Sequence, residues 1–116
     1  MSDPLRTLDL PAYLMAEGRS LAAIGLKGVA WPRAAALEIL GHLRGKGIVV
    51  LAGDVLRVEG ETPRHTYDNW RAQPAHGEPF SAYAERSVSQ AEAYIRGYRE
   101  PGPGYCYALV LTERLP

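Results

Sequence analysis

Acidic and aromatic side chains gather in two short stretches that could carry chemistry. The stretch Thr66–Trp70 reads "TYDNW", and a second acid, Asp54, follows an apolar run earlier in the chain. Paired carboxylates beside a histidine could perform general acid–base or metal-assisted hydrolysis, which needs them in one pocket. Asp54 and Asp68 would approach each other if their two segments pair as a hairpin, with His65 close by. A catalytic site is therefore one interpretation of these stretches, beside a structural one and a binding one.

The structural interpretation of "TYDNW" comes from the ordinary behaviour of its residue types. Asp68 and Asn69 can hydrogen-bond nearby backbone and shape the end of a strand. Trp70 can then pack at the core edge while its indole N–H seeks an acceptor. The binding interpretation notes that Trp, Tyr and Arg dominate interface hot spots, and that Tyr67, Trp70 and Arg71 supply all three.

Asp54 has the same two interpretations. An acid after glycine at a strand break commonly satisfies backbone donors. It can equally be presented at a sheet edge, where it would pair with a lysine or arginine of a partner.

The remaining metal-ligating and nucleophilic side chains form no motif. The three histidines lack metal-ligand spacing, and no cysteine accompanies them at zinc distances. The single cysteine, Cys106, stands between two tyrosines in an apolar run, which is typical of a buried or edge thiol. We therefore expect no catalytic residue, no metal and no cofactor.

Two helices are predicted from apolar spacing and from the residues that end them. Pro32 suits a first helical turn, and the apolar face that follows predicts a helix from about Pro32 to Lys46. A second apolar stripe begins at Phe80 and stops before "EPGPG". The segment near Pro11 predicts one or two short helices interrupted near Gly18.

The strands follow from β-type apolar runs. Ile48–Leu51 and Val55–Val58 read as extended, with a bulge, bend or tight turn at Gly53–Asp54. The segment "RHTYDNW" is a candidate hairpin partner, and "YCYALVLT" at 105–112 predicts a closing strand. If that last strand lies parallel beside "RHTYDNW", the second helix is a right-handed crossover. We predict one α+β domain over 1–116, with a small mixed sheet of three to four strands packed against about three helices.

Composition limits the class of protein. Lys+Arg and Asp+Glu are both 13, so the net charge is zero, which argues against a general nucleic-acid binder. One cysteine, no signal-peptide pattern and no apolar run of membrane-spanning length predict a cytoplasmic protein with no membrane partner.

The order of five phrases resembles the Imm40 family of immunity proteins from bacterial polymorphic toxin systems. The five phrases are "GVAW" at 28–31, "GIVVLAGDV" at 47–55, "TYDNW", "PFSAYAERS" and "AEAYI". A predicted helix separates the first two, and a terminal strand follows the last. The resemblance covers roughly Gly25 to Thr112. The chain departs from the family pattern at Ala52-Gly53, where a glycine pair is usual, and at Arg71, where an aromatic often follows the tryptophan.

The resemblance implies an inhibitor that binds and neutralises a cognate toxin by stoichiometric inhibition, without catalysis. We expect the partner-binding residues to be Asp54, Tyr67, Asp68, Asn69, Trp70 and Arg71. Two alternatives remain open. One is a small hydrolase using Asp54, Asp68 and His65, and the other is a homo-oligomeric structural or regulatory domain whose "TYDNW" faces a second copy. The sequence leaves the oligomeric state open.

Overall fold

The computed structural model describes residues 10–25 and 28–113, which form an α+β fold. The elements are α2 (Ala12–Ala16), β1 (Arg19–Ser20), η1 (Ala22–Ile24), β2 (Val29–Trp31), α3 (Arg33–Leu43), β3 (Val49–Glu59), β4 (Thr62–Arg71), α4 (Phe80–Gly97) and β5 (Tyr105–Thr112). The strands make one antiparallel sheet of five, in the order β1-β2-β5-β3-β4. The α+β class is confirmed, whereas the prediction of a mixed sheet with three to four strands is wrong. Two missed strands, β1 and β2, account for the difference in number.

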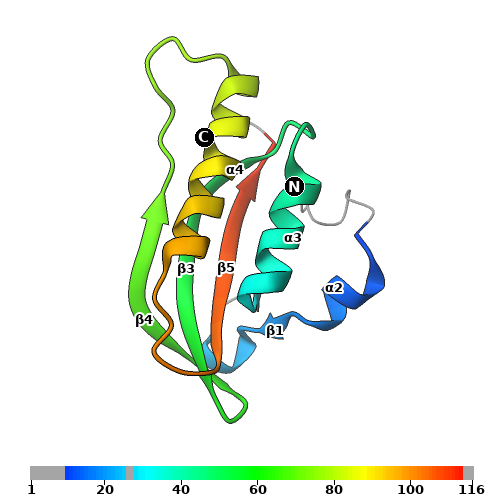
Figure 1. Ribbon diagram of the computed structural model, residues 1–116, viewed down its shortest axis with the longest axis vertical. Helices are drawn as coiled ribbons and strands as arrows, with labels where there is room; N and C mark the ends of the chain where they lie inside the picture. The colour runs from blue at the N-terminus through cyan, green and yellow to red at the C-terminus, as the bar shows by residue number, and fades with distance from the viewer. Residues whose placement is uncertain (1–9, 26–27, 114–116) are drawn as a thin grey trace.

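The long helices α3 and α4 lie side by side on one face of the sheet (Figure 1). Each begins directly after a proline, Pro32 or Pro79, whose fixed φ suits the start of a helix. The first helix ends at Leu43, three residues before the predicted end. Arg44 is already extended there, and Gly45 takes a φ of 73° that breaks the helical path.

Strand β3 lies inside the sheet, between β5 and the edge strand β4. Its apolar run needs a neighbour on each side, and it pairs with β4 on one edge and β5 on the other. The hairpin of β3 with β4 confirms the predicted partner. The parallel pairing considered for the last strand beside "RHTYDNW" does not occur, because β3 lies between β4 and β5. Both run antiparallel to β3 and so point the same way (Figure 1).

The sequence predicts a bulge, bend or tight turn between Ile48–Leu51 and Val55–Val58. No tight turn separates them, since β3 passes through Gly53 and Asp54 as one strand. Against β5, Val50 pairs with Leu111 and Ala52 pairs with Val110, so Leu51 is the extra residue. Against β4 the register shifts again between Asp54 and Leu56, so irregularities of pairing flank Gly53–Asp54 on both sides.

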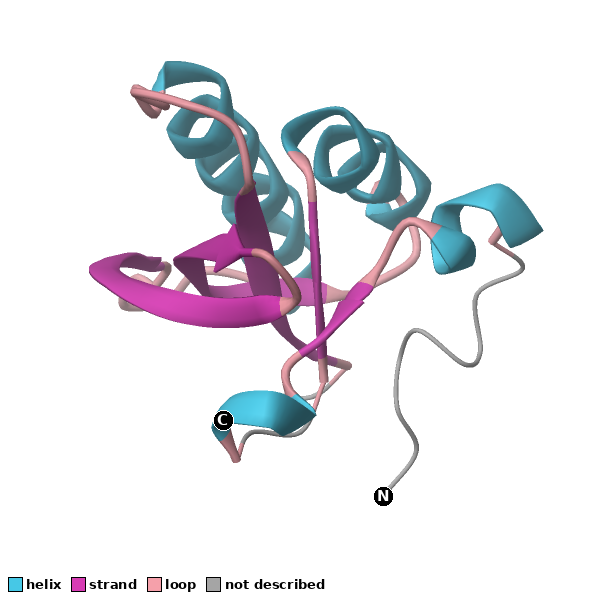
Figure 2. Ribbon diagram, turned by 90° about the horizontal axis from the view of Figure 1, so that it is seen from below, coloured by secondary structure: helices cyan, strands magenta, loops and turns pink. Residues whose placement is uncertain are grey.

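The two faces of the sheet are covered unequally. We call the face under α3 and α4 the helix face and the opposite one the outer face. The main core fills the helix face, with Trp31, Val55, Ile95 and Tyr107 among its fully buried members. A smaller cluster on the outer face packs under η1, which lies on that side of the sheet in Figure 2. Its buried members are Leu21, Ala30, Leu56, Cys106 and Ala108.

The segment before α3 is only partly helical. One short helix, α2, precedes Gly18, and the chain then forms β1 and the single turn η1 where a second helix was considered. Trp31 lies at the end of β2, and its indole Nε1 donates to the carbonyl of Leu14 at 3.0 Å, which ties α2 to the sheet. Among the helices of the described ranges, none has the length and apolar character needed to cross a bilayer.

Candidate functional site

Strand β4 leaves regular pairing in the middle of "TYDNW". Asp54 pairs with Asn69 and Leu56 pairs with His65, so Val55 alone faces three residues of β4. Those three are Thr66, Tyr67 and Asp68, and they form a bulge on the edge strand. Tyr67 has a φ of 68°, the single positive value among non-glycine residues of the described chain.

Local hydrogen bonds hold this bulge. Thr66 Oγ1 donates to the carbonyl of Val55 at 2.8 Å and accepts from the backbone N–H of Asp68 at 3.1 Å. Asn69 Nδ2 donates to the carbonyl of Tyr67 at 3.2 Å. The structural interpretation is therefore confirmed for Asn69, whose side chain bonds nearby backbone, whereas Thr66 takes the role expected of Asp68.

Trp70 is a core residue. Its side chain is 6% exposed, and its ring packs on Tyr94 with a centroid distance of 4.6 Å. A Cβ added at Gly53 would overlap three carbons of the Trp70 ring, so only glycine fits opposite it. The indole Nε1 is buried, and no acceptor for it lies within the described ranges. Trp70 thus supports the bulge from the helix face.

The two candidate carboxylates lie on opposite faces of the sheet. Tyr98, at the end of α4, donates its hydroxyl to Asp68 Oδ2 at 2.7 Å, which fixes Asp68 on the helix face. Burial raises the pKa of Tyr98, and this hydrogen bond raises it further. Asp54 is paired with Asn69 in the register and points to the outer face with it. The shared pocket on which the hydrolase alternative rests is absent from this geometry.

The outer face carries a shallow pocket of about 450 Å³ beside the β4 edge. Two rows of paired residues cross the sheet here. In one row Val110 pairs with Ala52 and Ala52 with Arg71. In the other, Ala108 pairs with Asp54 and Asp54 with Asn69. Each row therefore runs from an apolar residue on β5 to a polar one on β4.

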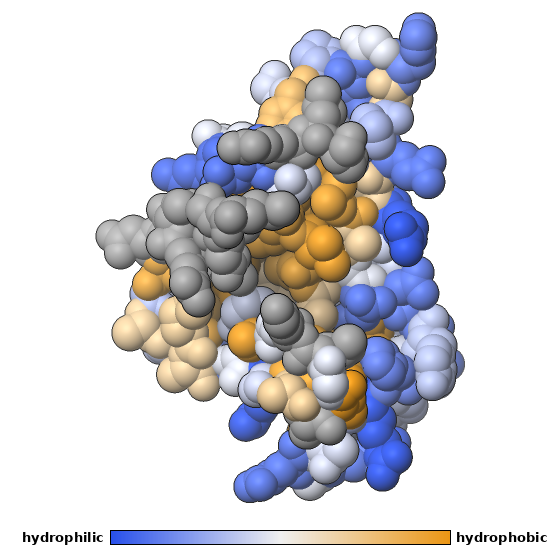
Figure 3. All heavy atoms as spheres, turned by 180° about the vertical axis from the view of Figure 1, so that it is seen from behind, coloured by the Kyte–Doolittle hydropathy of each residue, from blue (hydrophilic) through white to orange (hydrophobic). Residues whose placement is uncertain are grey.

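Figure 3 shows the same gradient, with apolar atoms in the middle of this face and hydrophilic atoms along the β4 side. Val110 is 46% exposed there. Asp54 and Arg71 both line the pocket, and neither side chain has a hydrogen bond or ion pair with another described residue. We define the outer-face patch as Asp54, Tyr67, Asn69, Arg71 and Val110.

Tyr67 belongs to this side of the sheet. His65 is opposite Leu56, which packs in the outer-face cluster, so its ring points outward. The ring of Tyr67 stacks on that of His65 at a centroid distance of 5.6 Å, and 84% of the Tyr67 side chain is exposed. Among the predicted site residues, the structure thus brings Asp54, Tyr67, Asn69 and Arg71 to one face. It turns Asp68 and Trp70 to the other.

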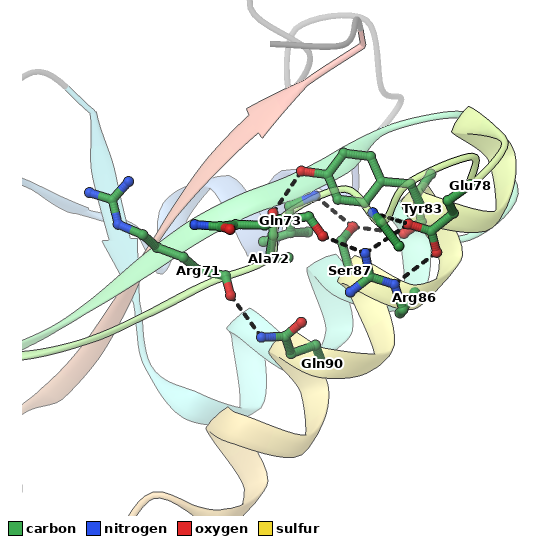
Figure 4. A network of polar contacts seen from close by, with 11 residues as sticks. Arg71, Ala72, Gln73, Glu78, Tyr83, Arg86, Ser87 and Gln90 are labelled. Atoms are coloured by element: carbon green, nitrogen blue, oxygen red, sulfur yellow. Dashed lines mark hydrogen bonds and ion pairs between the residues drawn. The ribbon is translucent and has the colours of Figure 1, made fainter.

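A network missed by the sequence reasoning fixes Arg71 and the loop after it (Figure 4). The carbonyl of Arg71 accepts from Gln90 Nε2 at 2.8 Å, while its guanidinium points away from α4. Tyr83 donates its hydroxyl to the carbonyl of Ala72 at 2.6 Å, and Arg86 donates to the carbonyl of Gln73 at 2.6 Å. The backbone behind the pocket is therefore anchored to α4.

Glu78 and Arg86 complete that network. Arg86 binds the carboxylate of Glu78 through two nitrogens, each at 2.8 Å, and the N–H of Ala75 donates to the same carboxylate at 3.1 Å. These hydrogen bonds lower the pKa of Glu78 to about 2. The sequence signal for this pair was an acid before the helix and an arginine eight residues later, on the first turns of α4.

The remaining reactive side chains occupy structural positions. Burial raises the pKa of the Cys106 thiol, which lies in the outer-face cluster. Within residues 10–25 and 28–113, no three His, Cys, Asp or Glu side chains are placed to hold a metal ion.

Val110 was also missed as a candidate. It lies in an apolar run that reads as buried throughout, although the period-two alternation of β5 turns Val110 outward.

Comparison with known protein families gives a match over most of the chain. The family model described as immunity protein 40 matches residues 20–111 of the 116-residue chain. No curated protein and no solved structure matches. The match runs from Ser20 in β1 to Leu111 in β5 and includes every residue of the outer-face patch. The chain belongs to the immunity protein 40 family.

Proposed function

We propose that this protein binds a cognate toxin and neutralises it by stoichiometric inhibition, with no catalysis of its own. The observation that carries the proposal is family membership over most of the chain. An immunity protein of a bacterial polymorphic toxin system would act in the cytoplasm of the cell that makes the toxin. Its partner would be a protein, and neither nucleic acid nor a membrane.

The geometry supports a binding role. The outer-face patch combines an exposed tyrosine, an exposed valine and two charged groups without partners in the described chain. Aromatic anchors and complementary charges are the features from which specific interfaces are built. Asp54, Tyr67, Asn69 and Arg71 would contact the toxin, whereas Asp68 and Trp70 would hold the contacting residues from behind.

A standard interface buries on the order of 1,600 Å² in total, of which the outer-face patch would be one part. The pocket and the outer edge of β4 would form its centre, where water is excluded most completely. The charges of Asp54 and Arg71 would orient the toxin on this centre.

Co-expression with the toxin encoded next to this gene tests the proposal. The wild-type protein is expected to restore growth and to co-purify with the toxin at equal stoichiometry, measured by light scattering. Failure both to bind and to protect removes the proposed function. Protection at far less than equimolar amounts of protein would point instead to an enzyme that modifies the toxin or its product.

A further inference from the structure

Tyr67 combines two properties that rarely occur together. Its side chain is the most exposed of the large hydrophobic ones among the described residues, at 84%, and its backbone has a φ of 68°. Tyr13, the next most exposed tyrosine, lies in the regular helix α2.

The positive φ of Tyr67 strains its backbone, and the tyrosine side chain has no property that lowers this cost. Glycine adopts such a φ readily, and asparagine and aspartate tolerate it because they hydrogen-bond locally. A tyrosine ring offers neither advantage. Here the ring contributes little to the core and stacks on His65 at the surface. Strained residues persist where function requires the geometry.

The bulge that carries Tyr67 is fixed on both sides. Thr66 is bonded to Val55, and Asn69 is bonded to the carbonyl of Tyr67 itself. Asp68 is bonded to Tyr98 on the helix face. The ring is therefore presented from a backbone that is already ordered, so that binding through it would lose little conformational entropy.

We propose that Tyr67 is the anchor of the interface and inserts its ring into a cavity of the toxin with apolar walls and a hydrogen-bonding group at its base. The inference rests on the proposed function and names the residue that carries it. A phenol matches such a cavity because its ring is apolar and its end is polar. The polar members of the outer-face patch, Asp54, Asn69 and Arg71, would orient the toxin beside this anchor.

Substitutions at Tyr67 should separate binding from folding. Tyr67→Gly relieves the strain, so Tm should stay the same or rise by a few degrees, on the order of 2–5 °C. Affinity for the toxin should fall at least about 30-fold, which is the hot-spot threshold of about 2 kcal/mol converted at 1.4 kcal/mol per factor of ten. Tyr67→Asn also suits the positive φ and should behave like Tyr67→Gly. Tyr67→Phe keeps the ring and should lose much less affinity than either.

The matched control is Tyr13→Ala, which removes an exposed tyrosine from α2, on the side of the molecule opposite β4 (Figure 1). Its affinity should remain within about threefold of wild type. Calorimetric titration with catalytically inactivated toxin gives the affinities, and thermal unfolding of the free protein gives Tm.

The outcomes distinguish the two proposals. If the wild-type protein does not bind the toxin, the proposed function fails, and the anchor fails with it. If the wild type binds and both Tyr67→Gly and Tyr67→Asn retain its affinity, the anchor is overturned while the proposed function stands. A fall of Tm in both variants would also overturn it, since Tyr67 would then support the fold.

Discussion

The six-membered ring of Trp70 occupies the space that a side chain at Gly53 would need. The two residues are directly paired across β3 and β4, close to the bulge that presents Tyr67. Gly53 is therefore required by packing, although its own φ is ordinary. Its neighbour Ala52 faces the outer pocket, where a methyl group is accommodated. This explains why alanine fits at position 52 while only glycine fits at position 53.

Gly53→Ala should destabilise the protein by about 1–3 kcal/mol, because the new methyl group pushes the Trp70 ring off Tyr94. Chemical denaturation measures the change. The control is Gly41→Ala in α3, where a Cβ meets no atom within 4 Å and stability should rise by about 0.5–1 kcal/mol. Equal stability of Gly53→Ala and wild type would contradict the close packing.

Asp68→Asn should lower stability by about 1 kcal/mol and leave toxin affinity within about threefold of wild type. The reason is that Asp68 accepts the hydroxyl of Tyr98 on the helix face and lies away from the outer-face patch. Asp54→Asn should leave stability unchanged, since its carboxylate has no partner in the described chain to lose. It should instead weaken toxin binding. Denaturation and titration of both variants test this separation. If Asp68→Asn weakens binding more than Asp54→Asn, the assigned faces are in error.

Glu78→Gln should remove part of the pH dependence of folding. Hydrogen bonds from Arg86 and from the backbone lower the pKa of Glu78 from 4.5 to about 2. The ionised carboxyl therefore stabilises the fold fully above pH 4.5, and this contribution is lost as the pH falls toward 2. The Tm of wild type should exceed that of Glu78→Gln at pH 7 and converge with it near pH 2. A constant difference across that range would mean that Glu78 does not titrate as described.

The parts of the fold with long, regular patterns were predictable. Strand β5 occupies the predicted residues, and α4 begins at the predicted Phe80, because breakers bound both patterns. Strands β1 and β2 have two and three residues, too few to give a periodic signal. The strand order could not be predicted either, since it depends on which edges of β3 and β5 become buried by tertiary packing.

The candidate site was predictable in composition and not in geometry. Residue types identified Asp54, Tyr67 and Arg71 as binding candidates, but did not show that Asp68 and Trp70 face α4. The register decided this point, because Asp54 is opposite Asn69 and not opposite Asp68. The bulge had no sequence signal, since tyrosine is among the residues least expected at a positive φ.

Charge reversal on the outer-face patch should weaken toxin binding by a factor of at least about ten. Asp54→Lys and Arg71→Glu each place the wrong sign against a group on the toxin that complements the native charge, and like charges across an interface are strongly unfavourable. Much of the loss should appear in the association rate. It should also shrink as salt is raised, because exposed charges are screened within about 10 Å at 0.1 M ionic strength.

The control for charge reversal is Glu17→Lys, at the end of α2 and on the opposite side of the molecule from β4 (Figure 1). Stopped-flow association with inactivated toxin at low and high salt measures all three variants. Only the two patch variants should slow association, while Glu17→Lys should match wild type. If Asp54→Lys and Arg71→Glu bind like wild type while Tyr67→Gly does not, the toxin engages the edge of β4 without entering the pocket. The contact surface would then be Tyr67 and its neighbours on the bulge.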